Sequence, residues 1–133
     1  MTFLIDTHTF IWAISDVKKL SDHALKIIKD KENDVFVSTV SFWEIALKTS
    51  IKKFFFEGIV VDDLPEYAQE TGFQILDIKA REACSFAKLP LKDNHKDPFD
   101  RMIICQAITK DMTLISKDKM FAQYQNDGLR LVW

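Results

Sequence analysis

Short apolar runs alternate with longer amphipathic segments along the chain. Five runs have the length and the β-branched or aromatic content of strands, at residues 2–5, 34–37, 73–78, 113–116 and 129–133. Helical spacing of apolar positions predicts helices at 10–14, 21–31, 40–51, 62–71, 80–87, 97–108 and 119–124. The strand runs are apolar throughout, as expected when helices cover both faces of a parallel sheet. The pattern therefore predicts an α/β domain with a mainly parallel sheet.

Composition narrows the class of protein. The chain has 133 residues, of which 47% are hydrophobic and 29% charged, so we expect one compact domain over residues 1–133 and exclude a disordered or fibrous chain. Charges interrupt every apolar stretch long enough for a membrane span, and Asp6 and His8 interrupt the first apolar run, so we expect no signal peptide. Cys84 and Cys105 are predicted to be small buried hydrophobes in a reducing, cytoplasmic setting.

The charge balance limits how this protein can handle a polyanion. Eighteen Lys and Arg face twenty Asp and Glu, a formal net charge of −2. A protein that coats nucleic acid with its own basic residues is much more positive. If this chain acts on phosphates, something other than its net charge must neutralise them.

Four acids lie near predicted strand ends or at a helix start, at the edge where α/β proteins place their sites. Asp6 ends the first strand, Glu44 lies in the helix after the second, and Asp100 begins the helix before the fourth, which Asp118 follows. Clustered carboxylates repel one another unless a cation binds them. An all-oxygen set suits Mg²⁺ or Mn²⁺, which activate water and stabilise charge in phosphodiester hydrolysis.

Each acid except Asp6 also has a purely structural interpretation. Glu44 follows Ser41 with the spacing of a capping box. Asp97 before Pro98 has the pattern of an N-cap, with Asp100 in the first turn, and Asp118 suits the N-cap of a short helix. Capping and cation binding are compatible, and the four acids together favour the functional interpretation.

Four sequence blocks resemble the PIN domain, most closely its VapC-type branch of toxin ribonucleases. They are Leu4-Ile-Asp-Thr-His8, Ser38-Thr-Val-Ser-Phe-Trp-Glu-Ile-Ala-Leu-Lys48, His95-Lys-Asp-Pro-Phe-Asp-Arg-Met-Ile-Ile104 with Gln106-Ala107, and Leu114-Ile-Ser-Lys-Asp118. Their order covers nearly the whole chain. The resemblance implies a three-layer α/β/α domain and a Mg²⁺- or Mn²⁺-dependent endoribonuclease that acts on RNA as the toxin of a toxin–antitoxin pair. It also implies a cognate antitoxin and a homodimer as partners.

By matched position, the resemblance assigns the catalytic quartet to Asp6, Glu44, Asp100 and Asp118, with Asp6 and Asp100 as the most direct metal ligands. Asp97 is expected mainly to cap its helix, with a supporting role beside Thr7 and Ser116. Ser116 stands where many relatives carry Thr.

Several further residues have two interpretations. Lys48, four residues after Glu44, either pairs with it or binds phosphate, and Arg101 either forms an ion pair or contacts substrate. For His8 and His95 we favour surface or loop hydrogen bonding over a role in phosphate contact or proton transfer. Two further features are predicted from apolar character: Trp12 and Trp43 as core or interface residues, and Phe54-Phe55-Phe56 as partly core and partly a partner surface.

The sequence thus predicts a metal-dependent endoribonuclease, with a catalytically silent PIN-like binding module as the alternative. A phosphatase with Asp6 as covalent nucleophile is disfavoured, because the second acid that it needs two residues later is His8. Without the four candidate acids, the remaining chain carries 18 basic and 16 acidic residues. The near-neutral total therefore predicts an acidic pocket in a slightly basic surface.

Overall fold

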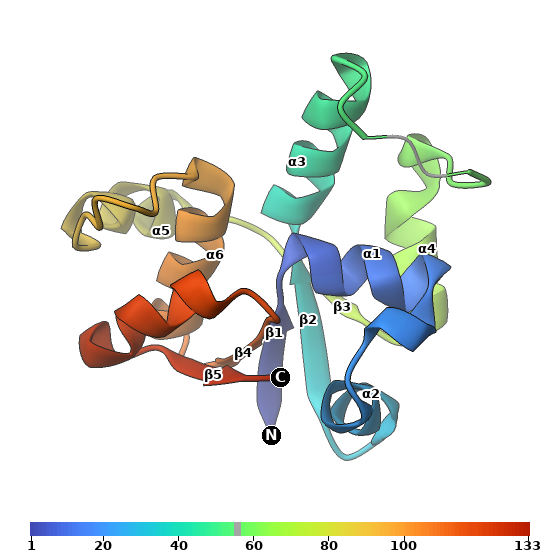
Figure 1. Ribbon diagram of the computed structural model, residues 1–133, viewed down its shortest axis with the longest axis horizontal. Coiled ribbons are helices and arrows are strands. Elements are labelled where there is room, and N and C mark those ends of the chain that lie inside the picture. The colour runs from blue at the N-terminus through green and yellow to red at the C-terminus, as the bar shows by residue number, and fades with distance from the viewer. Residues whose placement is uncertain (55–56) are drawn as a thin grey trace.

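The computed structural model describes residues 1–54 and 57–133. Strands and helices alternate through this part of the chain (Figure 1). The strands are β1 (Thr2–Ile5), β2 (Asp34–Ser38), β3 (Gln74–Leu76), β4 (Thr113–Ile115) and β5 (Arg130–Val132). The α-helices are α1 (Thr7–Ser15), α2 (Asp22–Lys29), α3 (Thr39–Ser50), α4 (Leu64–Thr71), α5 (Ala80–Ser85) and α6 (Pro98–Thr109). Short 3₁₀ helices lie at Val17–Lys19, Val61–Asp63, Phe86–Lys88 and Lys119–Asp127.

The described strands form one five-stranded sheet in the order β3-β2-β1-β4-β5. Every pairing is parallel, so all carboxyl ends lie at the same edge. Strands β2 and β3 are added on one side of β1, and strands β4 and β5, which come later in the chain, are added on its other side. This reversal places a switch point beside β1, where sites form in α/β folds. The predicted parallel sheet is confirmed.

Helices cover both faces of the sheet, with α1, α2 and α4 on one side and α5 and α6 on the other (Figure 1). Side chains of β1 alternate between two apolar cores. Phe3 and Ile5 pack with residues of α1, α2 and α4, whereas Leu4 packs with residues of α6 and of the 3₁₀ helix at Lys119–Asp127. Because a strand buried on both faces needs apolar residues at every position, this arrangement explains the uninterrupted apolar runs. The predicted three-layer α/β/α architecture is confirmed.

The cysteine prediction is correct for one residue and wrong for the other. Cys105 is buried on α6, as expected, but Cys84 is exposed on α5. Glu82 is the buried residue of that short helix. Residues two apart on a helix point about 200° away from each other, so Cys84 lies on the face opposite Glu82.

The aromatic predictions divide in the same way. Trp12 packs partly buried against the core, whereas Trp43 is 61% exposed and is therefore not a core residue, which leaves the interface prediction for it. Phe54 packs against the core of α1 and α4, while Phe55 and Phe56 lie outside the described residues. A partner surface at this segment stays a prediction. Within residues 1–54 and 57–133, no helix has both the length and the hydropathy that crossing a membrane requires.

Candidate functional site

A cleft of about 230 Å³ opens at the carboxyl edge of the sheet, above β1. Its walls combine acidic, basic and aromatic side chains: Asp6, His8, Trp12, Glu44, Lys48, Asp97, Asp100, Lys117 and Asp118. The five carboxylates of this set come from segments far apart in the sequence, and we call them the acidic cluster. All four acids predicted to converge are therefore brought to one cleft, together with Asp97.

Asp6 lies directly after β1 and is buried. Its carboxylate caps α1 by accepting a hydrogen bond from the backbone N–H of Thr9 at 2.9 Å, and it accepts a second from the hydroxyl of Ser116 at 2.5 Å. The sequence suggested no structural task for Asp6, and the N-cap corrects that interpretation. Burial raises the pKa of Asp6, against the opposing effect of the hydrogen bonds from Ser116 and Thr9.

Ser116 connects the end of β4 to Asp6 and to the next acid. Its hydroxyl also accepts a hydrogen bond from the backbone N–H of Asp118 at 3.1 Å. We expect Ser116→Ala to lower the free energy of unfolding by about 1–3 kcal/mol, because a buried carboxylate loses its donor. Urea denaturation measures this loss. Ser50→Ala removes an exposed hydrogen bond and is the control; equal losses in the two variants would contradict a supporting role for Ser116.

Glu44 projects from α3, which begins earlier than the sequence suggested. Ser38 caps this helix by accepting from the N–H of Val40 at 3.1 Å, so the capping box between Ser41 and Glu44 is wrong. Ser41 instead accepts a hydrogen bond from the hydroxyl of Thr7 at 3.0 Å, which ties the first turn of α1 to α3. Thr7 itself does not line the cleft, and its supporting role at the site stays a prediction.

Lys48 and Glu44 form the predicted i,i+4 ion pair, with Nζ 2.5 Å from Oε2. The ammonium also lies 5.0 Å from the ring centroid of Phe54. The other carboxylate oxygen, Oε1 of Glu44, is buried and has no hydrogen-bond partner within residues 1–54 and 57–133. A buried oxygen without a donor is costly, and a cation bound in the cleft would remove that cost.

Asp97 and Asp100 begin α6 as the sequence predicted. The carboxylate of Asp97 accepts from the backbone N–H groups of Phe99 at 2.8 Å and Asp100 at 3.2 Å, which confirms the N-cap. Asp100 follows one turn later. Burial and, to a smaller extent, the neighbouring carboxylates of Asp97 and Glu44 together raise the pKa of Asp100 to about 8.

Asp118 confirms the last of the predicted caps. It accepts from the N–H of Met120 at 2.9 Å at the start of the 3₁₀ helix, and it is exposed to solvent. Next to it, Lys117 lies 5.8 Å from the ring centroid of Trp12. Lys48 and Lys117 therefore both place positive charge on the walls of the cleft.

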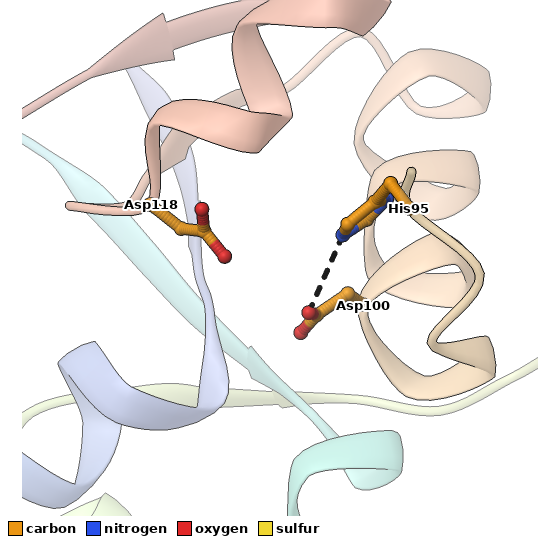
Figure 2. A group of neighbouring side chains, drawn as sticks. All are labelled: His95, Asp100 and Asp118. Atoms are coloured by element: carbon orange, nitrogen blue, oxygen red, sulfur yellow. Dashed lines mark ion pairs between the residues drawn. The ribbon is translucent and has the colours of Figure 1, made fainter. Parts of the chain in front are cut away.

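His95 lies deeper than the sequence suggested. It is buried, with Nδ1 2.9 Å from the Tyr124 hydroxyl and Nε2 3.5 Å from Oδ2 of Asp100. Of the predicted surface or loop hydrogen bonding, the surface alternative is therefore wrong, whereas hydrogen bonding from a loop is what the structure has. Figure 2 shows His95, Asp100 and Asp118 directed toward one another across an open space. Burial lowers the pKa of His95, while the charges of Asp118 and Asp97 oppose that effect. His95 could be singled out from the sequence because it lies just before the helix start at Asp97-Pro98. Nothing in the sequence indicated that Tyr124 would be its hydrogen-bond partner.

Arg101, predicted to form an ion pair or contact substrate, does not line the cleft. It is buried, its Nη2 donates to the carbonyls of Leu89 at 3.0 Å and Pro90 at 3.4 Å, and its guanidinium lies 4.8 Å from the ring centroid of Phe86. Its partners are main-chain carbonyls rather than an acid or the cleft. Arg101 therefore holds the loop before α6 in place.

We expect Arg101→Met to lower the free energy of unfolding by about 2 kcal/mol, because two carbonyls lose a charged donor. Urea denaturation measures the loss, and the exposed Arg81→Met is the matched control. The affinity of the folded Arg101 variant for an RNA oligonucleotide should equal that of the wild type. A loss of RNA affinity without a loss of stability would restore the predicted substrate contact.

A buried polar network links α3, α5 and α6 behind the cleft. Ser38 donates to Oε1 of Gln106 at 2.6 Å, and Gln106 donates to Glu82 at 3.2 Å. Lys110 completes the network with Nζ 2.9 Å from Glu82. The same serine caps α3, so the network fixes the start of the helix that carries Glu44. Sequence reasoning missed it because its members are distant along the chain.

The donor set of the cleft fits a divalent cation. Carboxylate oxygens are the ligands of hard ions, and at Asp100 the neighbouring carboxylates add to burial in raising the pKa. Of these residues, Asp6 and Asp100 are buried or half-buried and Asp118 is exposed. The arrangement can bind a cation between the acids while one side stays open to a phosphate group.

Comparisons with solved structures agree with this fold. The chain is similar to one in a structure of VapBC2 from Rickettsia felis bound to a DNA fragment from their promoter, with a TM-score of 0.66 and 18% sequence identity. The match covers 100% of this chain and 99% of that chain. A structure of DNA-bound VapBC from Salmonella typhimurium gives a TM-score of 0.67 at 16% identity, and the match covers 99% of this chain and 97% of that one. VapBC-5 from Mycobacterium tuberculosis gives 0.59 at 16% identity, covering 98% and 97%. At these identities the likeness concerns the fold.

Sequence comparisons place the chain in a family. A curated relative, a leucine–tRNA ligase from Archaeoglobus fulgidus, is 28% identical over 118 residues. The match covers 89% of this chain but 11% of the relative, so the chain spans about a tenth of that protein. A family model described as PIN domain matches residues 3–127, nearly the whole chain. The chain therefore belongs to the PIN domain family.

Proposed function

We propose that this chain is a Mg²⁺- or Mn²⁺-dependent endoribonuclease of VapC type, with one nuclease domain over residues 1–133, that acts as the toxin of a toxin–antitoxin pair. The observation that carries the proposal is the convergence of the acidic cluster in one open cleft. Membership of the PIN domain family supports it. In the part of the chain that the structure describes, Oε1 of Glu44 has no hydrogen-bond partner. This oxygen is a further possible ligand for a cation.

In this proposal, Asp6 and Asp100 hold the cation, with Glu44 and Asp118 beside them. A bound Mg²⁺ or Mn²⁺ neutralises phosphate charge and lowers the pKa of water, which is the chemistry that RNA hydrolysis requires. Ser116 and Thr9 orient Asp6 through hydrogen bonds, and Asp97 fixes the first turn of α6.

Proton transfer and phosphate binding are assigned to other groups of the cleft. Glu44 or Asp118 accepts the proton of the attacking water. Lys48 and Lys117 on the cleft walls attract the RNA backbone, which the net charge of −2 alone would not favour. The chain thus contributes positioning and charge, with no covalent nucleophile.

The partners proposed for this chain are a cognate antitoxin protein and a second copy of the chain, in the cytoplasm. The solved structures with similar folds include VapBC toxin–antitoxin assemblies, which supports an antitoxin as partner. The exposed Trp43, which packs edge-on against Phe99 at 5.1 Å between ring centroids, is a candidate contact for either partner.

Cleavage assays with the purified chain test the function. We expect it to cut a labelled RNA in the presence of Mg²⁺ or Mn²⁺, to leave DNA of the same sequence intact, and to stop when EDTA removes the cation. Equal cleavage in EDTA would refute the metal dependence. No cleavage of any RNA, together with retained RNA or protein binding, would favour the catalytically silent module.

A further inference from the structure

His95 brings a nitrogen atom to the acidic cluster that has no hydrogen-bond partner in the described part of the chain. The residue is 6% exposed, and its Nε2 atom has no hydrogen-bond partner among residues 1–54 and 57–133. Nε2 lies 3.5 Å from Oδ2 of Asp100, too far and too poorly aligned for a hydrogen bond. A buried polar atom in this state costs free energy unless something binds it.

The ring of His95 is held in a fixed orientation. Its other nitrogen, Nδ1, lies 2.9 Å from the hydroxyl of Tyr124, which is fully buried. The rings of Phe121 and Tyr124 contact the imidazole, with centroids 5.4 and 5.5 Å away. When Nδ1–H donates to Tyr124, Nε2 keeps a free lone pair. Histidines that bind metals in proteins have this arrangement, in which the second nitrogen donates to an outer partner.

The geometry of the three side chains suits one ion. One ligand atom each from His95, Asp100 and Asp118 lies within 4.8 Å of the other two. Opposite ligands of an ion with bonds of about 2.1 Å lie about 4.2 Å apart, so a small inward movement brings all three into contact with one cation. Figure 2 shows the imidazole and both carboxylates pointing into the same space.

We propose that His95 is a further, nitrogen ligand, through Nε2, of the divalent cation proposed above for Asp6 and Asp100, on the side of Asp100 that faces Asp118, and that Tyr124 orients it; this inference rests on the cation site of the proposed function. A mixed nitrogen and oxygen set favours Mn²⁺ over Mg²⁺, because imidazole suits transition metals whereas Mg²⁺ prefers oxygen ligands. Neutral imidazole also adds a ligand without adding negative charge to the cluster. The site is thereby tuned toward Mn²⁺.

Pulsed electron paramagnetic resonance of the Mn²⁺-loaded full chain tests this directly, because spin-echo modulation detects a ¹⁴N nucleus bound to Mn²⁺. The informative variant is His95→Asn, whose amide still reaches the Tyr124 hydroxyl from the position of Nδ1 but has nothing at Nε2. We expect ¹⁴N modulation in the wild type and none in the variant. The Mn²⁺ dissociation constant should rise by about tenfold or more, and that of Mg²⁺ by less.

The three histidines of the chain provide the control. His8 lines the cleft but is exposed, and His23 is exposed on α2. The double variant with His8→Asn and His23→Asn leaves His95 as the only imidazole, and it should keep the ¹⁴N modulation. This result supports the assignment even if His95→Asn does not fold.

Tyr124→Phe tests the orienting contact. It keeps the imidazole and removes the hydroxyl, so the ¹⁴N modulation should remain while Mn²⁺ affinity falls by about tenfold. An unchanged Mn²⁺ affinity would overturn the role assigned to Tyr124.

Two other outcomes overturn the inference and differ in what they say of the function. If the wild type binds Mn²⁺ without ¹⁴N modulation, or the double variant loses the modulation, His95 is not a ligand and the proposed function stands. If the wild type binds neither Mn²⁺ nor Mg²⁺, the inference and the proposed metal-dependent function both fail.

Discussion

Replacing Asp6 or Asp100 with asparagine is expected to reduce metal-dependent RNA cleavage by at least about a thousandfold, equivalent to about 4 kcal/mol of transition-state stabilisation. Each variant removes one negative charge from the acidic cluster and a proposed ligand of the cation. Asparagine keeps the shape of the carboxyl group; at position 6 its oxygen can accept from the backbone N–H of Thr9 while its NH₂ group donates to the hydroxyl of Ser116. The loss should therefore concern chemistry rather than folding.

Two measurements separate these causes. Cleavage of labelled RNA by the purified variants measures the chemical step, and circular dichroism with urea denaturation measures folding. Induction in cells should no longer inhibit growth. Asp62→Asn is the matched control, because Asp62 is exposed just before α4 and does not line the cleft. Wild-type cleavage by folded Asp6→Asn and Asp100→Asn variants would show that the site assignment is wrong.

The fold was predictable because its signals are local. Uninterrupted apolar runs indicated strands buried on both faces, and the alternation of strands with helices indicated parallel pairing. The start of α6 could be predicted from Asp97 and Pro98, since an N-cap residue followed by proline is a short-range signal for a helix start. The helix predicted to end at residue 71 does end there, and Gly72 follows it with the left-handed backbone (φ 95°) that favours glycine.

Helix starts were less certain where two serines competed. The capping-box pattern placed the helix start at Ser41, whereas Ser38 precedes α3 and Ser41 lies in its first turn. In the structure β2 runs directly into the helix, so the cap is Ser38 and Ser41 turns toward Thr7. Ser38 and Ser41 are both suitable N-cap residues, and the contact between Ser41 and Thr7 uses the second of them elsewhere. The cap at Asp6 was missed for a similar reason. Helix α1 begins at Thr7, directly after β1 and Asp6, with no loop between strand and helix to indicate a cap.

Residues whose role depends on distant neighbours were the ones mispredicted. His95 and Tyr124 are separated by 29 residues, and no local pattern links them. Arg101 adjoins Asp100 in sequence but, one residue along the helix, its side chain points about 100° away, toward Leu89. The acids themselves could be predicted because strand ends in a parallel sheet converge by topology alone.

The acidic cluster also predicts an unusual dependence of stability on pH. In buffer without divalent cations, Asp100 keeps its proton in the folded chain up to its pKa of about 8, whereas an unfolded aspartate loses its proton near about pH 3.9. Between these values the unfolded chain binds fewer protons. The free energy of unfolding therefore falls as pH rises, by up to about 1.4 kcal/mol per pH unit from this group. Asp6, whose pKa is also raised, acts in the same direction.

We therefore expect Asp100→Asn to match the wild type in stability near pH 4 and to exceed it at pH 8 in EDTA, because asparagine removes the cost of a buried charge. Urea denaturation between pH 4 and 8 gives both curves, and Asp62→Asn should follow the wild-type curve. Adding Mn²⁺ should stabilise the wild type most at pH 8, since the cation binds ionised carboxylates, and should stabilise Asp100→Asn much less. Parallel curves for the wild type and Asp100→Asn would mean that ionising Asp100 costs the fold nothing, and a cation would not be needed to offset the acidic cluster.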